Sequence, residues 1–367
     1  MRIGILGTRG IPARYGGFET LAEELSARLA ARGHDVTVYT RSRYAAPGVS
    51  VHRGAKVRVL PTVPTKYLDT VVHGALSAVD AAFERFDAVL VCNAINAASC
   101  FLPRLTGRTR VVLNVDGIER HRRKWSFAGK LAYRVSERLS TIVPDVVIAD
   151  ARVIQEYYRR RYGLESAFIP YGGDLPAPEG RAALDRLGLQ PERYVLYVSR
   201  LEPENNALAV VEAYRSVPGN TPLVVVGDAP YSADYIARVR AAVDARVLFP
   251  GAIYGEGYRE LLAHAAAYVQ ATEVGGTHPA LVEAMGFGRV VCYNRTPENE
   301  EVAGGAGLPF DASTPGSLAR LLQGVLDDPE AHSVWKVRAR ERTLERYRWD
   351  DVADRYETVL EGPGTIS

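Results

Sequence analysis

MRIGILGTRGIPARYGGFETLAEELSARLAARGHDVTVYT, residues 1–40, decides the fold of this chain. Arg2–Leu6 is predicted to be a buried strand, Gly7–Gly17 a glycine-rich loop and Phe18–Arg32 a helix. Apolar residues recur at helical spacing in the third segment, and Gly33 stands where a C-terminal capping glycine belongs. Val36–Tyr39 is the next strand. A strand, a helix and a second strand in this order predict a βαβ unit and a parallel sheet.

The same alternation continues along the chain in two series. The first continues with the strands Asp87–Val91, Arg110–Val115 and Asp145–Ala149 and the helix Arg152–Arg161. The second consists of the strands Arg193–Val198, Pro222–Gly227, Val247–Phe249, Ala267–Ala271 and Arg289–Tyr293. Two such series in 367 residues predict two α/β domains, each with a parallel sheet and helices on both faces.

The domain boundary is predicted in a segment rich in glycine and proline, YGGDLPAPEGRAALDRLGLQPER, residues 171–193. It lacks a strong strand pattern, as a hinge or linker does. We place the boundary near Gly173, which gives domains of residues 1–173 and 174–345. Residues 346–367 carry a last helix, Trp349–Leu360, with apolar residues on one face. That face either docks onto the second domain or crosses back to the first.

The composition is that of an ordinary globular chain. With 47% apolar and 24% charged residues, it excludes long disorder and a coiled coil, and a net charge of +2 argues against a nucleic-acid binder. The cysteines Cys92, Cys100 and Cys292 cannot all pair and show no CxxC spacing, so we expect reduced thiols. No signal-peptide pattern and no run of roughly 18 apolar residues is found. We therefore expect a cytoplasmic protein.

The first candidate site is the loop GTRGIPARYGGFE, Gly7–Glu19. A glycine-rich turn that opens a helix presents backbone N–H groups and the positive end of the helix dipole to an anion. A dinucleotide site requires GxGxxG, but here Pro12 intervenes and Gly16 and Gly17 come late. The favoured interpretation is a loop that reaches toward a ligand, and a purely structural turn is the alternative.

The second candidate is EVGGTHPALVEAMGFG, residues 273–288. Gly275 and Gly276 form a turn, and a helix follows them. Thr277 is suited to cap this helix, Pro279 to be its first residue and Gly288 to end it. Amide groups at the helix start suit a diphosphate, and the side chain of Glu283 suits a ribose diol. The alternative is an ordinary capped helix with a solvated Glu283.

The third candidate is VSRLEPENN, residues 198–206. Arg200 follows a strand, at the edge where open α/β sheets bind ligands. A guanidinium there can hold phosphate oxygens in a bidentate manner. The alternative is a surface ion pair of Arg200 with Glu202 or Glu204.

The fourth candidate is the basic segment Arg104–Arg134, which holds nine Lys or Arg and two Asp or Glu. Basic residues, among them Arg122, Arg123 and Lys124, are interleaved with Trp125, Phe127 and Tyr133, as suits an anionic membrane surface or a diphosphate-bearing acceptor. A solvated helix face is the alternative. The sequence shows no DxD, HxxxH or Cys/His cluster for a metal, and no GxSxG or Cys–His pattern for acyl chemistry.

Taken together, these segments resemble a known family. The stretches GTRGIPARYGGFET, NVDGIERHRRKW, RLEPENN and EVGGTHPALVEAM are similar to bacterial rhamnosyltransferase-type members of the retaining family-4 glycosyltransferases. The resemblance spans nearly the whole chain. It implies the GT-B fold, in which two Rossmann-like domains face each other across a cleft, the first on the acceptor side and the second binding a nucleotide sugar.

The resemblance also implies a reaction. A sugar, L-rhamnose from dTDP-rhamnose, passes to a lipid-linked or glycan acceptor in cell-surface polysaccharide synthesis, without a metal or other cofactor. Contact with the anionic inner face of the cell membrane is expected. Retention implies front-face attack, with the leaving phosphate helping to deprotonate the acceptor hydroxyl. The alternatives are a non-catalytic sugar-nucleotide-binding subunit and a nicotinamide-dependent oxidoreductase.

Site roles follow residue by residue from the resemblance. Arg200 and Asp116 are implied as catalytic, although the position of Asp116 aligns with a histidine in relatives. Donor binding is implied for Gly16, Gly17, Asn206, Gly275, Gly276, Thr277, His278 and Glu283.

The chain departs from the family pattern at two of these positions. Relatives place two glutamates eight positions apart, and the second matches Glu283. The first would stand at Gly275, with Glu273 two residues earlier. The residue six positions after Arg200 is a lysine in relatives and Asn206 here. Both changes favour a donor with fewer hydroxyl contacts, such as a 6-deoxy sugar.

Overall fold

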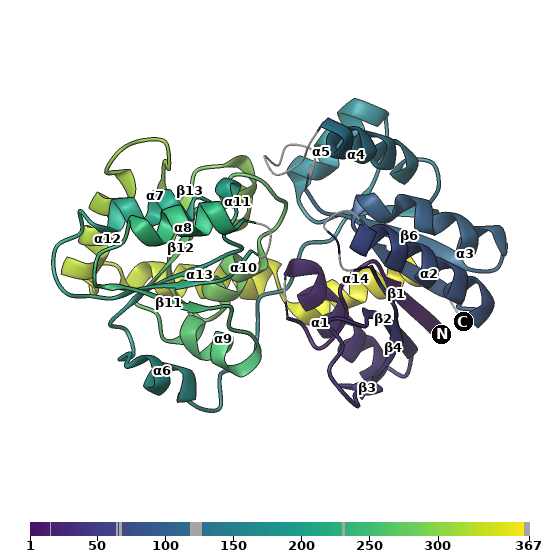
Figure 1. Ribbon diagram of the computed structural model, residues 1–367, viewed down its shortest axis with the longest axis horizontal. Helices are drawn as coiled ribbons and strands as arrows, with labels where there is room; N and C mark the ends of the chain where they lie inside the picture. Colours follow the sequence, from purple (N-terminus) through teal and green to yellow (C-terminus); the bar gives the residue numbers. More distant parts are fainter. Residues whose placement is uncertain (15, 64, 66–67, 118–126, 230–231, 363–367) are drawn as a thin grey trace. The chain divides into compact units, whose positions relative to one another are not determined.

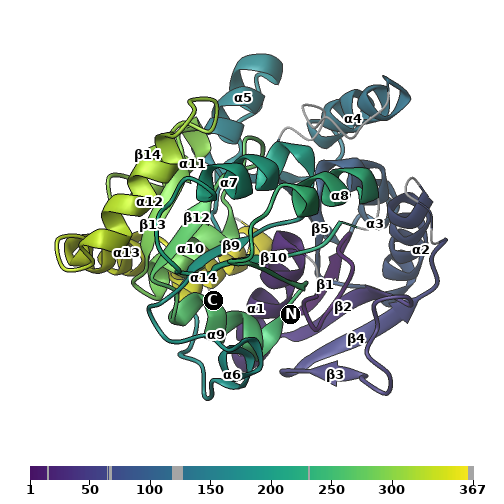
Figure 2. The same cartoon turned by 60° about the vertical axis from the view of Figure 1, so that its left-hand side comes forward.

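A computed structural model describes residues 1–362 except 15, 64, 66–67, 118–126 and 230–231 (Figure 1). The described residues form two units. The first contains the chain up to Tyr171 together with the segment from Trp349 onward, and the second contains Gly172–Arg348. Each unit has its own sheet, which Figure 2 shows from a second direction.

The sheet of the first unit has the strand order β3-β4-β2-β1-β5-β6-β7-β8. Its strands are β1 (Arg2–Leu6), β2 (Asp35–Arg41), β3 (Val51–His52), β4 (Ala55–Leu60), β5 (Ala88–Cys92), β6 (Arg110–Val115), β7 (Val146–Ala149) and β8 (Ala167–Phe168). All neighbouring strands are parallel except β3 and β4, which are antiparallel. The carboxyl ends of the central strands therefore meet at one edge.

Among the described residues before Gly172, five α-helices and a 3₁₀ helix alternate with these strands. They are α1 (Gly17–Ala31), α2 (Leu68–Glu84), η1 (Ala94–Cys100), α3 (Phe101–Leu105), α4 (Phe127–Ser140) and α5 (Arg152–Tyr162). Gly33 lies just past the end of α1 in a left-handed conformation, and its N–H donates to the Ala30 carbonyl at 3.0 Å. This confirms the predicted capping glycine.

The sheet of the second unit has the order β11-β10-β9-β12-β13-β14, and its paired strands are parallel. Its elements are α6 (Ala182–Leu187), β9 (Val195–Val198), η3 (Pro203–Asn205), α7 (Ala207–Tyr214), β10 (Leu223–Val226), α8 (Ala233–Ala241), β11 (Val247–Gly251), α9 (Gly255–Ala263), β12 (Ala267–Gln270), α10 (Pro279–Gly286), β13 (Val290–Asn294), α11 (Pro297–Ala303), β14 (Leu308–Phe310), α12 (Ser317–Asp327) and α13 (Ser333–Arg346).

The core of the second unit lies on both faces of its sheet. Side chains alternate along a strand, so Val195 and Tyr197 of β9 join one hydrophobic cluster while Leu196 joins the other. Both faces are therefore buried, as the apolar strand runs predict for a parallel sheet. Two α/β units with parallel sheets confirm the predicted fold class.

The last helix, α14 (Trp349–Glu361), packs on the first unit against α1, β5 and β6. The side chain of Trp349 is fully buried, and the Asn114 side-chain amide donates to the Tyr356 hydroxyl at 2.5 Å. Arg28 Nε pairs with Asp350 Oδ1 at 3.0 Å. Docking of this helix onto the second unit is therefore wrong, because its apolar face is covered by elements of the first.

Candidate functional site

In the second unit, the segments after β9 and β12 are joined by one side chain. Asn206 has a left-handed backbone (φ 60°) between η3 and α7, and its amide donates to the Ala271 carbonyl at 2.9 Å and to Glu273 Oε1 at 3.0 Å. The Glu273 N–H donates in turn to the Glu204 carbonyl at 2.9 Å. Because β9 and β12 are neighbours in the sheet, these bonds bring the third and second candidate segments together.

Arg200 lies two residues past the end of β9 and is half-buried rather than on the surface. Its guanidinium lies 3.8 Å from Glu202, whose side chain is only 8% exposed, while that of Arg200 is 28% exposed. The carbonyl of Arg200 accepts a hydrogen bond from Asn205 Nδ2 at 2.6 Å. An ion pair with Glu202 therefore exists, but it lies in a folded loop and leaves part of the guanidinium accessible.

The turn Gly275–Thr277 is buried and leads into α10, whose first residue is Pro279, as predicted. The residue at the helix cap is His278, so the expected cap at Thr277 is wrong. A Cβ atom on Gly275 would lie 2.4 Å from Cε1 of the His278 ring. The imidazole thus occupies the space that any side chain at position 275 would need.

His278 stands at the end of a chain of buried side chains. The Tyr268 hydroxyl donates to Gln270 Oε1 at 2.8 Å, and Gln270 Nε2 donates to Thr272 Oγ1 at 2.5 Å. Thr272 Oγ1 lies 3.0 Å from His278 Nε2. Burial, with the nearby Tyr197 and Glu283, raises the pKa of Tyr268 well above its usual value, so its hydroxyl keeps its proton.

The contact of Nε2 with the Thr272 hydroxyl fixes the position of the His278 ring. His278 is also the N-cap residue of α10, so its imidazole lies beside the first turn of this helix, where the helix dipole favours an anion.

Glu283 lies on α10 and is 2% exposed, so the solvated alternative is wrong. Its Oε2 accepts a hydrogen bond from the hydroxyl of Tyr258, which lies on α9. Burial and the adjacent Glu283 carboxylate raise the pKa of Tyr258 well above its usual value, and the phenol stays a donor. Each carboxylate oxygen can accept more than one hydrogen bond, so the Glu283 carboxylate can accept from a ligand in addition to Tyr258.

In the first unit, the glycine-rich loop is held by carboxylates of α1. The Arg9 N–H donates to Glu19 Oε1 at 2.8 Å, and the Ala13 N–H donates to Glu23 Oε2 at 2.5 Å. Gly10 (φ 111°) packs so closely on β2 that a Cβ atom would lie 2.1 Å from Thr40 Oγ1. The sequence reasoning missed both glutamates, which lie four residues apart on one face of α1.

Gly16 and Gly17 are placed where a strand-to-helix loop ends. Gly16 caps α1 in an extended conformation, and Gly17 is its first residue. The carbonyl of Gly16 accepts from the N–H groups of Glu19 and Thr20 at 3.1 and 3.2 Å. The loop therefore ends at the N-terminus of a 15-residue helix, as the anion-binding interpretation requires.

Asp116 and Asp150 follow the neighbouring strands β6 and β7, whose last residues, Val115 and Ala149, are paired in the sheet. Asp150 is fully buried and Asp116 is half-buried. Burial, and then the charges of Asp116 and Asp150, raises the pKa of the Tyr171 hydroxyl well above its usual value. Asp150 was not predicted as a site residue. Its position directly after a buried strand, like that of Asp116, could have indicated it.

The remaining residues singled out from the sequence are the three cysteines and four residues of the basic segment. Cys92, Cys100 and Cys292 are buried and free, and burial raises the pKa of the last two thiols to about 12. Arg122, Arg123, Lys124 and Trp125 lie outside the described residues.

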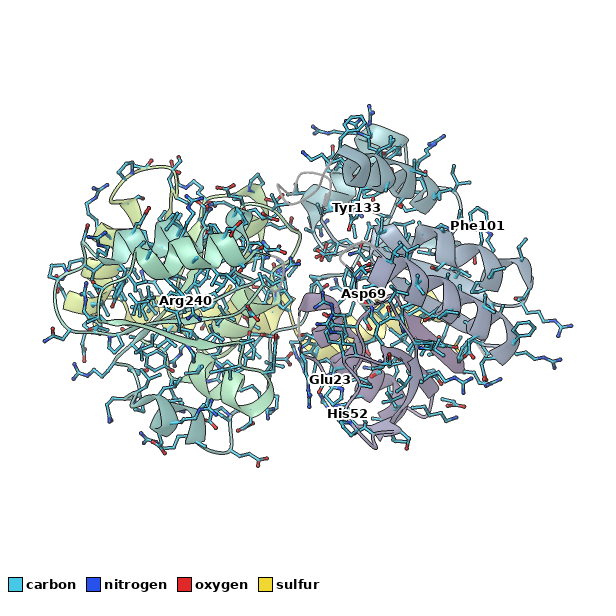
Figure 3. The ribbon with its side chains drawn as sticks, viewed as in Figure 1. Glu23, His52, Asp69, Phe101, Tyr133 and Arg240 are labelled. Atoms are coloured by element: carbon cyan, nitrogen blue, oxygen red, sulfur yellow. The ribbon has the colours of Figure 1, made fainter. Side chains whose placement is uncertain are left out.

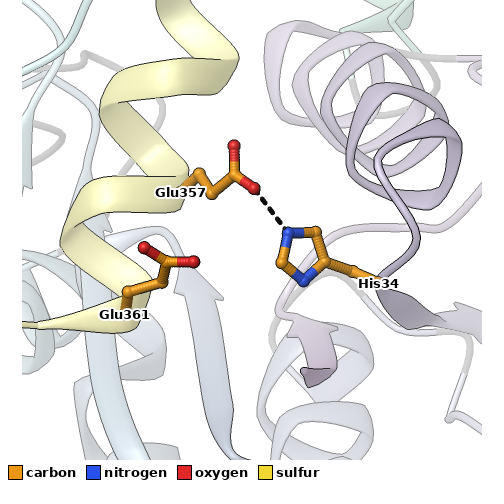
Figure 4. A group of neighbouring side chains, drawn as sticks. All are labelled: His34, Glu357 and Glu361. Carbon is orange, nitrogen blue, oxygen red and sulfur yellow. Dashed lines mark hydrogen bonds and ion pairs between the residues drawn. The ribbon is translucent and has the colours of Figure 1, made fainter. Parts of the chain in front are cut away.

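His34, Glu357 and Glu361 form a group whose ligand atoms lie within 4.8 Å of one another (Figure 4). His34 Nε2 is 2.6 Å from Glu357 Oε1, and Arg32 Nη1 is 2.5 Å from the other oxygen of Glu357. Burial acts to raise the pKa of Glu357, but the bonds from His34 and Arg32 outweigh it and lower the pKa. This group holds α14 to the first unit.

Comparison with known proteins agrees with both units. The Glycosyl transferase 4-like domain family matches residues 16–172, and the Glycosyl transferases group 1 family matches residues 185–342. O-antigen chain mannosyltransferase B of Escherichia coli is 28% identical over 179 residues, or 46% of this chain and 45% of that protein. The match thus spans less than half the length of this relative.

Solved structures share the fold at low sequence identity. Sucrose-phosphate synthase from Thermosynechococcus elongatus gives a TM-score of 0.81 at 18% identity, over 98% of each chain. HepE of Anabaena in complex with UDP and glucose gives 0.78 at 18%, over 98% of this chain and 99% of that one. WaaG, a glycosyltransferase involved in lipopolysaccharide biosynthesis, gives a TM-score of 0.73 at 18% identity, over 96% of this chain and 99% of that one. With the two family matches, this fold identifies the chain as a GT-B glycosyltransferase that has a glycosyl transferase 4-like domain followed by a group 1 domain.

Proposed function

We propose that this protein transfers a sugar from a nucleoside-diphosphate donor to a lipid-linked or glycan acceptor in cell-surface polysaccharide synthesis. The names of two similar proteins support the pathway, since one acts on O-antigen chains and the other in lipopolysaccharide biosynthesis. HepE, with the same fold, binds UDP and glucose. The observation that carries the proposal is the joining of Arg200, Asn206 and the turn before α10 at two adjacent strand ends.

The donor diphosphate is proposed to bind at these strand ends of the second unit. Arg200 supplies a guanidinium. The turn Gly275–Thr277 supplies backbone N–H groups directly before the positive end of the α10 dipole. The imidazole of His278 lies beside this turn, and the Glu283 carboxylate is proposed to accept from the ribose diol. Charge develops on the leaving diphosphate in the transition state, so fixed donors at this place lower the barrier.

The reaction is proposed to retain the anomeric configuration and to need no metal. Front-face attack lets a leaving phosphate oxygen take the proton of the acceptor hydroxyl, so no enzyme nucleophile is required. Arg200 and the N–H groups before α10 supply the positive charge that a divalent cation supplies elsewhere. Transfer by dialysed enzyme that survives a chelator is the expected result, and strict dependence on magnesium would contradict this part of the proposal.

The donor is proposed to be a 6-deoxy sugar nucleotide, dTDP-L-rhamnose. The His278 ring occupies the space beside Gly275, so a glutamate at this position, as relatives have, would require the ring to move. Asn206 is committed to the Ala271 carbonyl and to Glu273, which leaves it fewer donors for a sugar. A donor that lacks one hydroxyl fits a site with fewer polar contacts.

A panel of nucleotide sugars tests the function, because a ligand that binds only the native state raises the melting temperature. We expect dTDP-rhamnose to give the largest shift and to be consumed when a lipid-linked acceptor is added. A matched Arg200→Lys variant should bind donor but transfer slowly. Binding without consumption by any acceptor would favour a non-catalytic subunit, and no shift with any nucleotide sugar would contradict the proposal.

Contact with an anionic membrane is proposed as well, to bring the enzyme to a lipid-linked acceptor. In the part of the chain that the structure describes, no helix has both the length and the apolarity to cross a membrane. Arg104, Arg108, Lys130 and Arg134 of the basic segment are exposed. Each Lys or Arg near an anionic surface contributes about 1 kcal/mol, so attachment is peripheral and reversible.

A further inference from the structure

Helix α2 turns its apolar side chains outward. Leu68, Val71, Leu76, Val79 and Phe83 recur at helical spacing and are 39–82% exposed, Phe83 the most. A surface helix normally buries such a stripe and exposes its polar face. Here the arrangement is reversed.

The inward face of α2 combines small and polar residues, and two of its carboxylates make specific bonds. Asp69, labelled in Figure 3, is buried and accepts from Arg41 Nη1 at 2.5 Å. His73 and Ser77, at successive turns of the same face, are fully buried. Asp80 accepts from the Tyr39 hydroxyl at 2.8 Å. These bonds fix the rotation of the helix, so it cannot roll to hide its apolar stripe.

Helix α3 extends the apolar surface. Phe101, which Figure 3 also labels, is 45% exposed, and Leu102 and Leu105 are 41% and 77% exposed. Helices α2 and α3 contact each other, and both contact η1. We call these eight side chains of α2 and α3 the α2–α3 face. Contiguous apolar surface of this kind marks an interaction site in a soluble domain.

The charges around the α2–α3 face are positive. Arg108 follows α3, and Lys130, Arg134 and Arg138 are exposed on α4, which also contacts η1. Arg104 on α3 is exposed as well but pairs with Asp145 at 3.3 Å. Within the described residues of α3 and α4, Glu137 is the single carboxylate, and it is buried.

The carboxylates of α2 that reach the surface are neutralised. Asp80 pairs with Arg58 at 2.8 Å, and Glu84 pairs with Arg2 at 3.2 Å. An apolar face with a basic rim is complementary to a bilayer that contains anionic lipid, where apolar side chains enter the acyl boundary and cations meet headgroups.

We propose that the α2–α3 face inserts its apolar side chains into the surface of an anionic lipid bilayer. This proposal rests on the proposed peripheral contact, and it names an apolar surface where the sequence indicated only a basic segment. The charge attraction and the apolar insertion respond differently to salt. The Debye length falls from about 10 Å at 0.1 M to about 3 Å at 1 M, which weakens the attraction, whereas apolar burial persists. Part of the attachment should therefore survive high salt.

Vesicle flotation of the full chain tests the proposal, with phosphatidylcholine vesicles with and without added phosphatidylglycerol, at low and high salt. The test variant is Val79→Asp with Phe83→Asp. The matched control is Val337→Asp with Leu344→Asp, which are 56% and 48% exposed on α13 of the second unit. At low salt, the partition coefficient of the test variant to anionic vesicles should be about tenfold or more lower than that of the wild type, because two apolar side chains no longer enter the bilayer. At high salt, the test variant should not float at all. The control should float like the wild type.

Melting temperature and nucleotide titration show whether each variant is folded. A folded test variant that floats like the wild type overturns the proposal, as does a wild type that does not float on anionic vesicles. A wild-type dimer that the test variant dissociates, without flotation, assigns the face to a second copy and overturns the lipid proposal. Flotation as expected without any nucleotide-sugar binding supports this surface while contradicting the proposed transfer.

Discussion

The two units of this enzyme end their central strands with different chemical groups. In the first unit, Asp116 and Asp150 follow the paired strands β6 and β7, and both carboxylates raise the pKa of a buried tyrosine. In the second, Arg200 and the imidazole of His278 stand beside the strand ends and the N-terminus of α10. The backbone plan is shared, but the residues just after the strands differ.

This difference indicates how one architecture supports two tasks. In an open parallel sheet, ligands bind at the carboxyl ends of the strands, so the first residues after each strand determine what is bound. N–H donors and a guanidinium suit a diphosphate, whereas carboxylates accept from the hydroxyls of a sugar acceptor. Substitutions in the second unit should therefore change donor affinity, and those in the first should change transfer alone.

Arg200→Ala should reduce turnover more than any other substitution considered below. A smaller loss would contradict the division of tasks between the two units. Removing one group that stabilises transition-state charge costs about 100- to 1,000-fold in turnover. The melting temperature should change little, because the guanidinium is partly exposed and its ion pair with Glu202 is 3.8 Å long. Turnover at saturating donor is the measurement, and a near-wild-type rate would remove Arg200 from the reaction.

Glu283→Gln should weaken nucleoside-diphosphate binding by about 10- to 100-fold, since hydrogen bonds to a charged group contribute about 1.5–3 kcal/mol. Calorimetric titration measures this affinity. Tyr258→Phe is the matched control, because it removes the donor that anchors the carboxylate and leaves the charge. Unchanged affinity in Glu283→Gln would mean that this carboxylate serves packing alone.

Asp116→Asn should reduce transfer by about tenfold, the lower end for a lost hydrogen bond to a charged group. The affinity for the nucleoside diphosphate should stay within twofold of the wild type. Asp150→Asn is a useful partner, because this fully buried carboxylate should affect stability as well. Loss of nucleotide affinity in Asp116→Asn would contradict the division of tasks between the two sets of strand ends.

Thr272→Val should have the smallest effect, about fivefold, as for the loss of one neutral hydrogen bond. Without the hydroxyl, His278 Nε2 loses a hydrogen-bond partner that holds the ring beside α10, so the donor KM should change more than kcat. Thr272→Ser restores the hydroxyl and should restore the KM. A serine variant that behaves like valine would indicate a packing role for Thr272.

Most of the fold was predictable from the sequence because buried parallel strands are continuous apolar runs. Arg2–Leu6 and Arg110–Val115 were predicted with the bounds that the structure has. The edge strand β3 and its neighbour β4 were missed, because they are partly exposed and lack such a run. The periodicity of α14 was recognised, but periodicity shows only that one face is buried and not which unit covers it.

The candidate site was predictable in its motifs and not in its contacts. Arg200 and the turn before α10 were found from their positions after strands, and the site roles come from the family resemblance. The chain of bonds from Tyr268 to His278 was not foreseen, because it depends on side-chain directions within the folded β12 region. The outward apolar stripe of α2 was missed for a related reason, since tertiary bonds of Asp69 and Asp80 set the rotation of the helix.

The central claim is that the donor diphosphate binds at the strand ends of the second unit. Calorimetric titration of dTDP into the wild type, Arg200→Ala and Asp116→Asn tests it most directly. The account predicts that Arg200→Ala weakens binding by about tenfold or more, as for a lost charge-assisted hydrogen bond, while Asp116→Asn binds like the wild type. Equal affinity in the wild type and Arg200→Ala, with weakened binding in Asp116→Asn, would contradict it.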